Sequence, residues 1–555
     1  MAPRLVTRRL VLHPAGSRPR CLRSFAIQSR LTTTTNRSRP ILPFLFIPRS
    51  SPNSVRRYTS ERQRWWKHEA KLVARYTLTL WGVVICVLTI FFAFNEEALE
   101  REFPTPHEWH YLTRKFLRDA NNYKDPKNGQ INWARALELS RGVVIRLEDP
   151  AIDGQDVVKL SDVVDPQLEV PGEFIACDIT AKPEEWRRGY FEAIMLAAKA
   201  AEHVDGWLRD TTRNIVTPPE FVIGPSNPHP TPIPPGNPSA PREEDCETAY
   251  PSADNWYTKI LATKGLTPRQ KVQACLEFAS FMEFKNSPEA AESLYKLALA
   301  EATSSLSDPK KLPYDPRTFV LKERAEPPSL NLLDALTATA NHIARKGDVA
   351  SALPIYLSIL KARRSLSDDP PRAAAPKRRS ESFPRQILNF FAPPEYPPPP
   401  PDGTQPPWRS PSERCQEAAL NLYIGEILYA TGSKDDGLAW TRDGVDLAEE
   451  QLRNPKLSQD DTAREAKATC RNCLSTGLDN WSVMVSRLAR EEKQKKASGS
   501  SPSSMFSFWS GSLSQDSETR WEAEEVVIQE RVKRTRELLE DVQAPKADIV
   551  SFFKV

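Results

Sequence analysis

Residues 271–302, KVQACLEFASFMEFKNSPEAAESLYKLALAEA, have small side chains at a spacing that predicts two antiparallel helices. Ala279 is followed twelve residues later by Ala291, and Tyr295 and Ala298 come four and seven residues after that. Small side chains at the first two positions let two helices approach closely, and the tyrosine position packs onto the neighbouring helix. A residue larger than alanine at Ala279 or Ala291 should force the pair apart, because overpacking costs about 1–3 kcal/mol.

The same spacing recurs at Ala340, Gly347, Ala352 and Tyr356, and again at Gly425, Gly432, Gly437 and Gly444. These offsets are those of the tetratricopeptide repeat, whose eighth and twentieth positions are small and whose fifteenth turns the chain. The array is irregular, because 61 residues separate the first two copies and Thr441 stands where an aromatic residue is usual. A helix containing Gly477 is expected to pair with residues 521–542. We therefore expect an all-α, degenerate helical solenoid with a concave binding face.

Residues 1–58 contain twelve arginines and no acidic residue, which is the composition of a mitochondrial presequence. The stretch RRYTS at 56–60 resembles the site at which the matrix processing peptidase cuts. A basic tail without targeting function is the alternative. Removal of this segment leaves 64 basic and 72 acidic residues, which argues against nucleic acid as a partner, because phosphate binding needs a basic surface.

Residues 76–94, YTLTLWGVVICVLTIFFAF, carry no charge and predict a single transmembrane helix. As a helix they extend about 28 Å, which matches the hydrocarbon core of a bilayer. A buried core helix is the alternative, although it would normally show a polar stripe. Five basic residues lie in 59–75, whereas four glutamates follow the span within 96–102. By the positive-inside rule, the N-terminus lies in the matrix and residues 95–555 in the intermembrane space.

Proline-rich stretches at 217–241 and 365–411 and a serine-rich one at 498–517 interrupt the helical pattern and favour polyproline II or disorder. The expected organisation is a presequence (1–58), matrix stub (59–75), transmembrane helix (76–94), juxtamembrane and N-terminal helical region (95–215), Pro-rich linker (216–249), repeat hairpins (250–363), disordered Pro-rich insertion (364–411), further repeat helices (412–497), Ser-rich linker (498–517) and C-terminal helix (518–555).

No motif predicts catalysis, so we expect a protein that is not an enzyme and has no cofactor or metal. The sequence HEWH at 107–110 places its histidines three residues apart, where a zinc protease needs four. Cys470 and Cys473 form a C-x-x-C within a predicted helix, with no second pair of ligands at zinc-finger spacing. Buried helical cysteines are therefore expected there.

The first helix of each predicted repeat supplies the candidate binding residues. Repeats that dock chaperones carry Lys, Arg or Asn at set positions of this helix, and only Asn341 fits, which disfavours chaperone docking. The predicted face for extended client segments consists of Glu277, Asn341, Tyr423 and Glu426. The alternative is that these side chains only solvate their helices. Apolar clusters at 382–396 and 505–511 are further candidate motifs, unless they fold back onto the solenoid.

Three long stretches carry a family resemblance: RQRWWKHEAKLVARYTLTLWGVV (62–84), EREFPTPHEWHYLTR (100–114) and PEEWRRGYFEAIMLAAKAAEHVDGWLRD (183–210). Followed by repeat hairpins, they resemble the fungal tetratricopeptide adaptor subunit of the mitochondrial i-AAA protease complex. The resemblance covers residues 62–485 or so and assigns no individual binding residue. It implies a mitochondrial inner-membrane protein for protein quality control that binds unfolded or misassembled proteins and promotes their delivery to the protease.

The partners that this resemblance implies are the i-AAA protease, its other adaptor subunit and unfolded membrane-protein clients. Residues 96–118, together with the anchor, are the predicted contact with the protease. The alternative is a tetratricopeptide scaffold or assembly factor for a respiratory or other inner-membrane complex. Such a protein would share every sequence feature and differ only in what it holds.

Overall fold

The computed structural model describes residues 61–125, 131–160, 172–233, 239–304, 312–323, 326–369, 396–454, 462–499 and 520–539, without the side chains of 462–465 and 495–499. The expected presequence and the candidate motif at 505–511 lie outside the described residues, as does the motif at 382–396 apart from Tyr396. The chain divides into two compact units, Met1–Val87 and Leu88–Val555.

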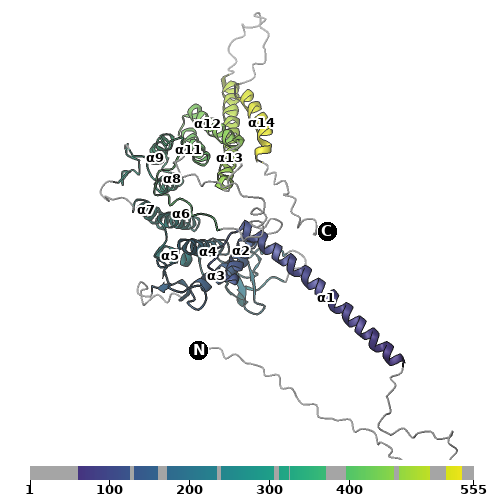
Figure 1. Cartoon of the computed structure of the whole chain (residues 1–555). Coiled ribbons are helices and arrows are strands. Elements are labelled where there is room, and N and C mark those ends of the chain that lie inside the picture. Colours follow the sequence, from purple (N-terminus) through teal and green to yellow (C-terminus); the bar gives the residue numbers. More distant parts are fainter. Residues whose placement is uncertain are drawn as a thin grey trace, which may run out of the picture. The chain divides into compact units, whose positions relative to one another are not determined.

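Helix α1, Glu61–Glu102, contains the predicted span at 76–94 (Figure 1). It also includes the part of the expected matrix stub from Glu61 onward, because no proline interrupts the helical pattern there. The hydroxyls of Thr77 and Thr79 donate to carbonyl oxygens in the preceding turn, which satisfies them inside the helix. The apolar side chains of the span are exposed, and by length and composition α1 could cross a membrane.

The first part of the second unit is built from α2 (Tyr111–Lys124), α3 (Trp133–Leu147), α4 (Glu184–His203) and α5 (Ala253–Ala262). Helix α4 is central, because α3 and α5 both pack against it and most of its side chains are buried. Its alanines within 193–201 are fully covered, and such small side chains permit close packing on several sides. Trp186 and Tyr190 stack with ring centroids 5.5 Å apart in the same core.

Among the described residues, short strands accompany these helices: β1 Val158–Lys159, β2 Cys177–Asp178, β3 Leu208–Asp210, β4 Ile215–Thr217 and β5 Cys246–Thr248. β1 pairs antiparallel with β2, and β3 lies between β4 and β5 in an antiparallel sheet. The segment 216–249, expected to be a linker, thus supplies β5 and part of β4. The all-α expectation is corrected to a mostly helical fold with short strands, which at two or three residues are too brief to show alternation in the sequence.

Helical hairpins follow: α6 Pro268–Phe284 with α7 Pro288–Thr303, α8 Leu330–Arg345 with α9 Val349–Arg364, and α11 Pro411–Ala430 with α12 Lys434–Arg453. Three residues join each pair, and the middle one has a positive φ: Asn286 (57°), Gly347 (93°) and Gly432 (106°). Glycine adopts this left-handed conformation freely and asparagine tolerates it. The predicted turns at Gly347 and Gly432 are therefore confirmed. Successive hairpins pack side by side, α7 on α8 and α9 on α11 (Figure 1).

The small residues and the tyrosines predicted at the helix contacts are buried. Full or nearly full burial is found for Ala279, Ala291, Tyr295, Ala298, Ala340, Ala352 and Tyr356. The tightest approach joins α11 to α12, where a Cβ on Gly437 would lie 2.7 Å from the carbonyl oxygen of Gly425 and 2.5 Å from the backbone nitrogen of Tyr429. A Cβ on Gly425 would lie 2.5 Å from Thr441 Oγ1, so an aromatic ring at 441 would have no room.

Gly437→Ala is expected to lower the free energy of unfolding by about 1–3 kcal/mol, because the new methyl group meets backbone atoms that cannot rotate away. Gly142→Ala in α3 is the matched control, since its Cβ would come no closer than 3.8 Å, to Phe116. Better helix propensity should stabilise that variant by up to about 1 kcal/mol. Urea unfolding of the full-length proteins in detergent, followed by circular dichroism, measures both. An unchanged midpoint for Gly437→Ala would contradict the close approach.

Helices α13 (Thr462–Gly499) and α14 (Arg520–Leu539) pack against each other, as expected for the helix that contains Gly477 (Figure 1). Helix α13 also packs on α11 and α12. A disulfide joins Cys415 of α11 to Cys470 of α13, and Cys473 is buried and free. Both cysteines of the C-x-x-C are therefore buried in a helix, as predicted, but the partner of Cys470 lies 55 residues away and is not indicated by the sequence.

The Pro-rich insertion expected to be disordered at 364–411 contains an ordered part at 396–410. Arg188 of α4 donates to the carbonyl oxygens of Pro397 and Pro398 at 2.6 and 2.9 Å. Its guanidinium also lies 4.3 Å from the centroid of the Tyr396 ring. A guanidinium has enough donors to satisfy several carbonyls and a flat face that stacks on an aromatic ring. The expectation of disorder is therefore wrong for this segment.

Candidate functional site

Glu277, the first residue of the predicted client-binding face, lies on α6 and pairs with Lys199 of α4 at 2.9 Å. Both side chains are about one-third exposed. This ion pair lies where α4 meets α6, so Glu277 contributes to the contact between the N-terminal helices and the first hairpin. The structure does not place it with the contacts that join the other three predicted residues.

Asn341 and Tyr423 come together across α8, α9 and α11. Tyr356 of α9 donates its hydroxyl to Oδ1 of Asn341 on α8 at 2.6 Å. The rings of Tyr356 and Tyr423, the latter from α11, have centroids 5.6 Å apart. Burial raises the pKa of both phenols, so both hydroxyls remain protonated and can donate at neutral pH. The cluster therefore combines two packed aromatic rings with a hydrogen bond between a tyrosine and an asparagine.

Glu426 lies on α11 three residues after Tyr423, and Nδ2 of Asn480 on α13 donates to it. Desolvation raises the pKa of the Glu426 carboxyl, and the hydrogen bond from Asn480 acts in the opposite direction. The residue remains exposed at the surface. A carboxylate in this position offers acceptor oxygens beside the aromatic pair, which suits the backbone N–H groups of an extended peptide.

Three of the four predicted residues thus form one cluster, which we call the inner-helix cluster: Asn341, Tyr356, Tyr423, Glu426 and Asn480. Sequence reasoning identified Tyr356 only as a packing residue, although its tyrosine hydroxyl signals a polar partner. It missed Asn480 altogether, because nothing in the sequence shows where α13 crosses α11. The cluster contains no nucleophile beside a base, so hydrogen bonding and aromatic contact are the chemistry it can perform.

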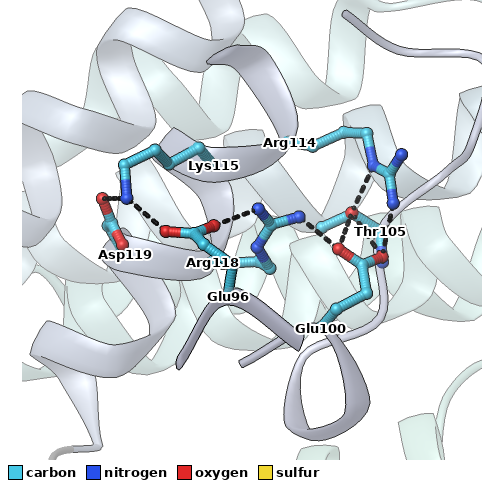
Figure 2. A network of polar contacts seen from close by, with 7 residues as sticks. All are labelled: Glu96, Glu100, Thr105, Arg114, Lys115, Arg118 and Asp119. Atoms are coloured by element: carbon cyan, nitrogen blue, oxygen red, sulfur yellow. Dashed lines mark hydrogen bonds and ion pairs between the residues drawn. The ribbon is translucent and has the colours of Figure 1, made fainter. Parts of the chain in front are cut away.

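The end of α1 that belongs to the second unit is joined to α2 by a buried charge network (Figure 2). Arg118 of α2 donates to Glu96 at 2.6 Å and to Glu100. Lys115 donates to the other oxygen of Glu96 at 2.5 Å, and Arg114 pairs with Glu100 at 2.9 Å. Arg118 is only 3% exposed, so each of its charged partners is needed to offset its desolvation.

Backbone and hydroxyl groups complete the network. The N–H and Oγ1 of Thr105 donate to Oε1 of Glu100 at 3.1 and 2.9 Å (Figure 2). The two glutamates are four residues apart on α1, as Arg114 and Arg118 are on α2, which puts each pair on one helix face. Two of the four glutamates that follow the span, Glu96 and Glu100, are therefore used within the fold, inside the stretch 96–118 that is the predicted contact with the protease.

The HEWH sequence at 107–110 has structural roles. Trp109 is buried and packs edge-on against Trp186 with centroids 6.4 Å apart. His110 is the N-cap of α2, and its Nδ1 accepts from the backbone N–H of Leu112 at 3.3 Å. Within the part of the chain that the structure describes, no group of three His, Cys, Asp or Glu side chains could hold a metal ion.

A scan of the chain against protein-family models finds no match, and a search of curated proteins also finds none.

Proposed function

We propose that the protein is a non-catalytic, membrane-anchored adaptor of the mitochondrial inner membrane. It binds unfolded or misassembled proteins and promotes their delivery to the i-AAA protease. Helices α6 to α14 form its degenerate tetratricopeptide solenoid, α1 is its anchor, and residues 95–555 face the intermembrane space. The observation that carries the proposal is one hairpin geometry repeated three times, each with a three-residue turn centred on a positive φ, in a chain that also contains a long apolar helix.

The charge network between α1 and α2 supports a role that depends on tethering. A binding domain held beside a partner experiences an effective concentration of about millimolar when its linker is short. The buried contacts of Arg118 with Glu96 and Glu100 fasten the last turns of α1 to α2.

The disulfide between Cys415 and Cys470 supports the proposed compartment. Disulfides persist in oxidising surroundings and are rare where glutathione and thioredoxin keep thiols reduced. A bond that joins α11 to α13 is thus more in keeping with exposure of this part of the chain outside the matrix.

Complexome profiling of gently solubilised mitochondria tests the proposal. We expect the protein to comigrate with the i-AAA protease and its other adaptor subunit. Comigration with a respiratory complex alone would overturn the proposal in favour of an assembly scaffold.

Protease treatment of mitoplasts tests the orientation. The region after α1 should be digested without detergent, and protection of that region would contradict the proposed orientation.

The double variant Tyr423→Ala with Glu426→Ala is expected to weaken binding of an unfolded client at least about tenfold, since aromatic anchors often contribute 2 kcal/mol or more to an interface. Fluorescence anisotropy with labelled casein, an unfolded protein, and the full-length protein in detergent measures the affinity. Arg414→Ala with Glu450→Ala is the matched control, because this exposed pair joins α11 to α12 outside the inner-helix cluster. Equal affinities of the Tyr423/Glu426 variant and the wild type would exclude the cluster as the client site.

A further inference from the structure

Five consecutive prolines, residues 397–401, follow Tyr396 in the ordered part of the Pro-rich insertion. Proline fixes its own φ near −65°, and it also drives the preceding residue into an extended conformation. Residues 397–400 are subject to both constraints, which together define the polyproline II helix. In the structure the chain runs without a bend from 396 to 402. We call residues 397–401 the polyproline segment, and at about 3.1 Å per residue it is about 15 Å long.

Contacts with two different helices fix both ends of the polyproline segment. At one end, Arg188 of α4 donates to the carbonyl oxygens of the first two prolines at 2.6 and 2.9 Å. At the other end, Nδ2 of Asn331 on α8 donates to the carbonyl oxygen of Asp402 at 3.0 Å, and the backbone N–H of Asn331 donates to that of Gly403 at 3.1 Å. Arg188 and Asn331 are themselves buried, so both anchors belong to the packed part of the fold.

The anchors hold the backbone of the polyproline segment and leave its side chains free. Both Arg188 and Asn331 bind carbonyl oxygens, and the ring that lies against the guanidinium of Arg188 is that of Tyr396. All five prolines are exposed. Within the described residues, the carbonyl oxygens of residues 399–401 accept no hydrogen bond. The segment therefore presents exposed apolar rings beside hydrogen-bond acceptors that no other group uses.

The chemistry of proline excludes most ways in which a partner could bind this segment. Prolines have no backbone N–H, so the segment cannot pair as a strand with the edge of a sheet, and it cannot fold into a helix for a groove. It carries no charge, so it offers nothing to a phosphate. The remaining mode of peptide recognition is the binding of a polyproline II helix in an aromatic groove.

An aromatic groove matches both features of the segment. Its ring faces pack on the exposed proline rings, while a tryptophan N–H or a tyrosine O–H donates to a free carbonyl oxygen. Because the backbone is already extended and fixed at both ends, binding would immobilise little that is not immobile before. The fixed position next to α4 and α8 also lets a partner contact the surface of the scaffold beside the prolines.

We propose that the polyproline segment is a docking site for a protein domain with a groove lined by aromatic side chains. The groove packs on the exposed proline rings and donates hydrogen bonds to the carbonyl oxygens of residues 399–401. This site goes beyond the proposed function, because it depends neither on the membrane placement nor on the protease. It shares no residue with the inner-helix cluster, so a domain bound here and an unfolded client use different contacts.

Purified SH3, WW and EVH1 domains, whose aromatic grooves bind polyproline II helices, serve as probes. Biolayer interferometry with the immobilised full-length protein in detergent measures their affinities, and an immobilised peptide of residues 394–405 is measured in parallel. At least one of the domains should bind the protein, and it should bind the protein at least as tightly as the peptide. Binding to the peptide alone would show that the fold covers the segment, and binding to neither would show that no aromatic groove reads it. Either result would overturn the proposal.

Pro399→Ala with Pro400→Ala should weaken the binding of that domain about tenfold or more, because two rings and their conformational restriction are lost. Pro228→Ala with Pro232→Ala is the matched control, since these two exposed prolines lie in the other Pro-rich stretch and alternate with other residues. The control should bind as the wild type does. Equal affinities of the Pro399/Pro400 variant and the wild type would overturn the assignment.

Light scattering of the same proteins tests a second copy of this chain as the occupant. The wild type and the Pro399/Pro400 variant should have the same mass, because the proposed partner is a different protein. A wild-type dimer that the variant loses would assign the polyproline segment to contacts between copies and would overturn the proposal.

Discussion

Replacing Arg118 with methionine is expected to lower the free energy of unfolding by about 3–5 kcal/mol. The substitution leaves the carboxylates of Glu96 and Glu100 buried without their shared cation, although Lys115 and Arg114 each retain one of them. Methionine has a similar length and fills the space, so the loss reflects uncompensated charge. Urea unfolding of the full-length protein in detergent, followed by tryptophan fluorescence, measures the change.

Arg101→Met is the matched control, because Arg101 pairs with Glu97 at 3.0 Å on the exposed side of α1. An exposed pair four residues apart contributes about 0.3–0.5 kcal/mol, so this variant should be nearly unchanged. Adding Glu96→Gln and Glu100→Gln to Arg118→Met should recover part of the loss, since the two buried carboxylates that lost their shared cation are then neutral. Equal midpoints for the two arginine variants would show that the network does not fix α1 to α2.

Limited proteolysis gives the same prediction a structural readout. Residues 103–110 connect α1 to α2 and are held by Thr105 and Trp109, both buried. When Arg118 is lost, this connection should open locally and become the preferred cleavage site. The wild type and Arg101→Met should be cleaved there much more slowly.

The hairpins could be predicted from the sequence because their determinants are local. Two facing small residues and one turn residue occupy fixed offsets, so the positions of Gly425, Gly437 and Gly432 follow from counting. Asn286 completes the series in the first copy, where asparagine replaces the turn glycine. The apolar span could be predicted for a similar reason, since it is one uninterrupted run.

The features that the sequence did not reveal depend on contacts between distant residues. The Cys415–Cys470 bond requires α13 to lie on α11, and the contact of Arg188 with Pro397 spans about 200 residues. No periodicity records such pairings. The inner-helix cluster was predicted only in part for the same reason, because Asn480 reaches Glu426 from another helix.

Removal of the disulfide by Cys415→Ala with Cys470→Ala is expected to destabilise the C-terminal helices by about 4 kcal/mol. The bond closes a loop of 55 residues, and a cross-link of that length reduces the entropy of the unfolded chain by roughly this amount at 25 °C. Both cysteines are fully buried, and alanine avoids placing a new polar group in the core. Urea unfolding followed by circular dichroism, without reductant, measures the loss.

Reductant separates the effect of the bond from the effect of the substitutions. Dithiothreitol should lower the unfolding midpoint of the wild type toward that of the double variant, and it should leave the double variant unchanged. Cys246→Ala is the control, because that cysteine is free and only half-buried, and its midpoint should follow the wild type with and without reductant. Indifference of the wild type to reductant would contradict the disulfide. The bond joins α11 to α13, and these helices carry Tyr423, Glu426 and Asn480. Loss of the bond should therefore destabilise the helices of the inner-helix cluster first. Client binding should weaken in reducing conditions before the hairpins α6–α7 and α8–α9 unfold.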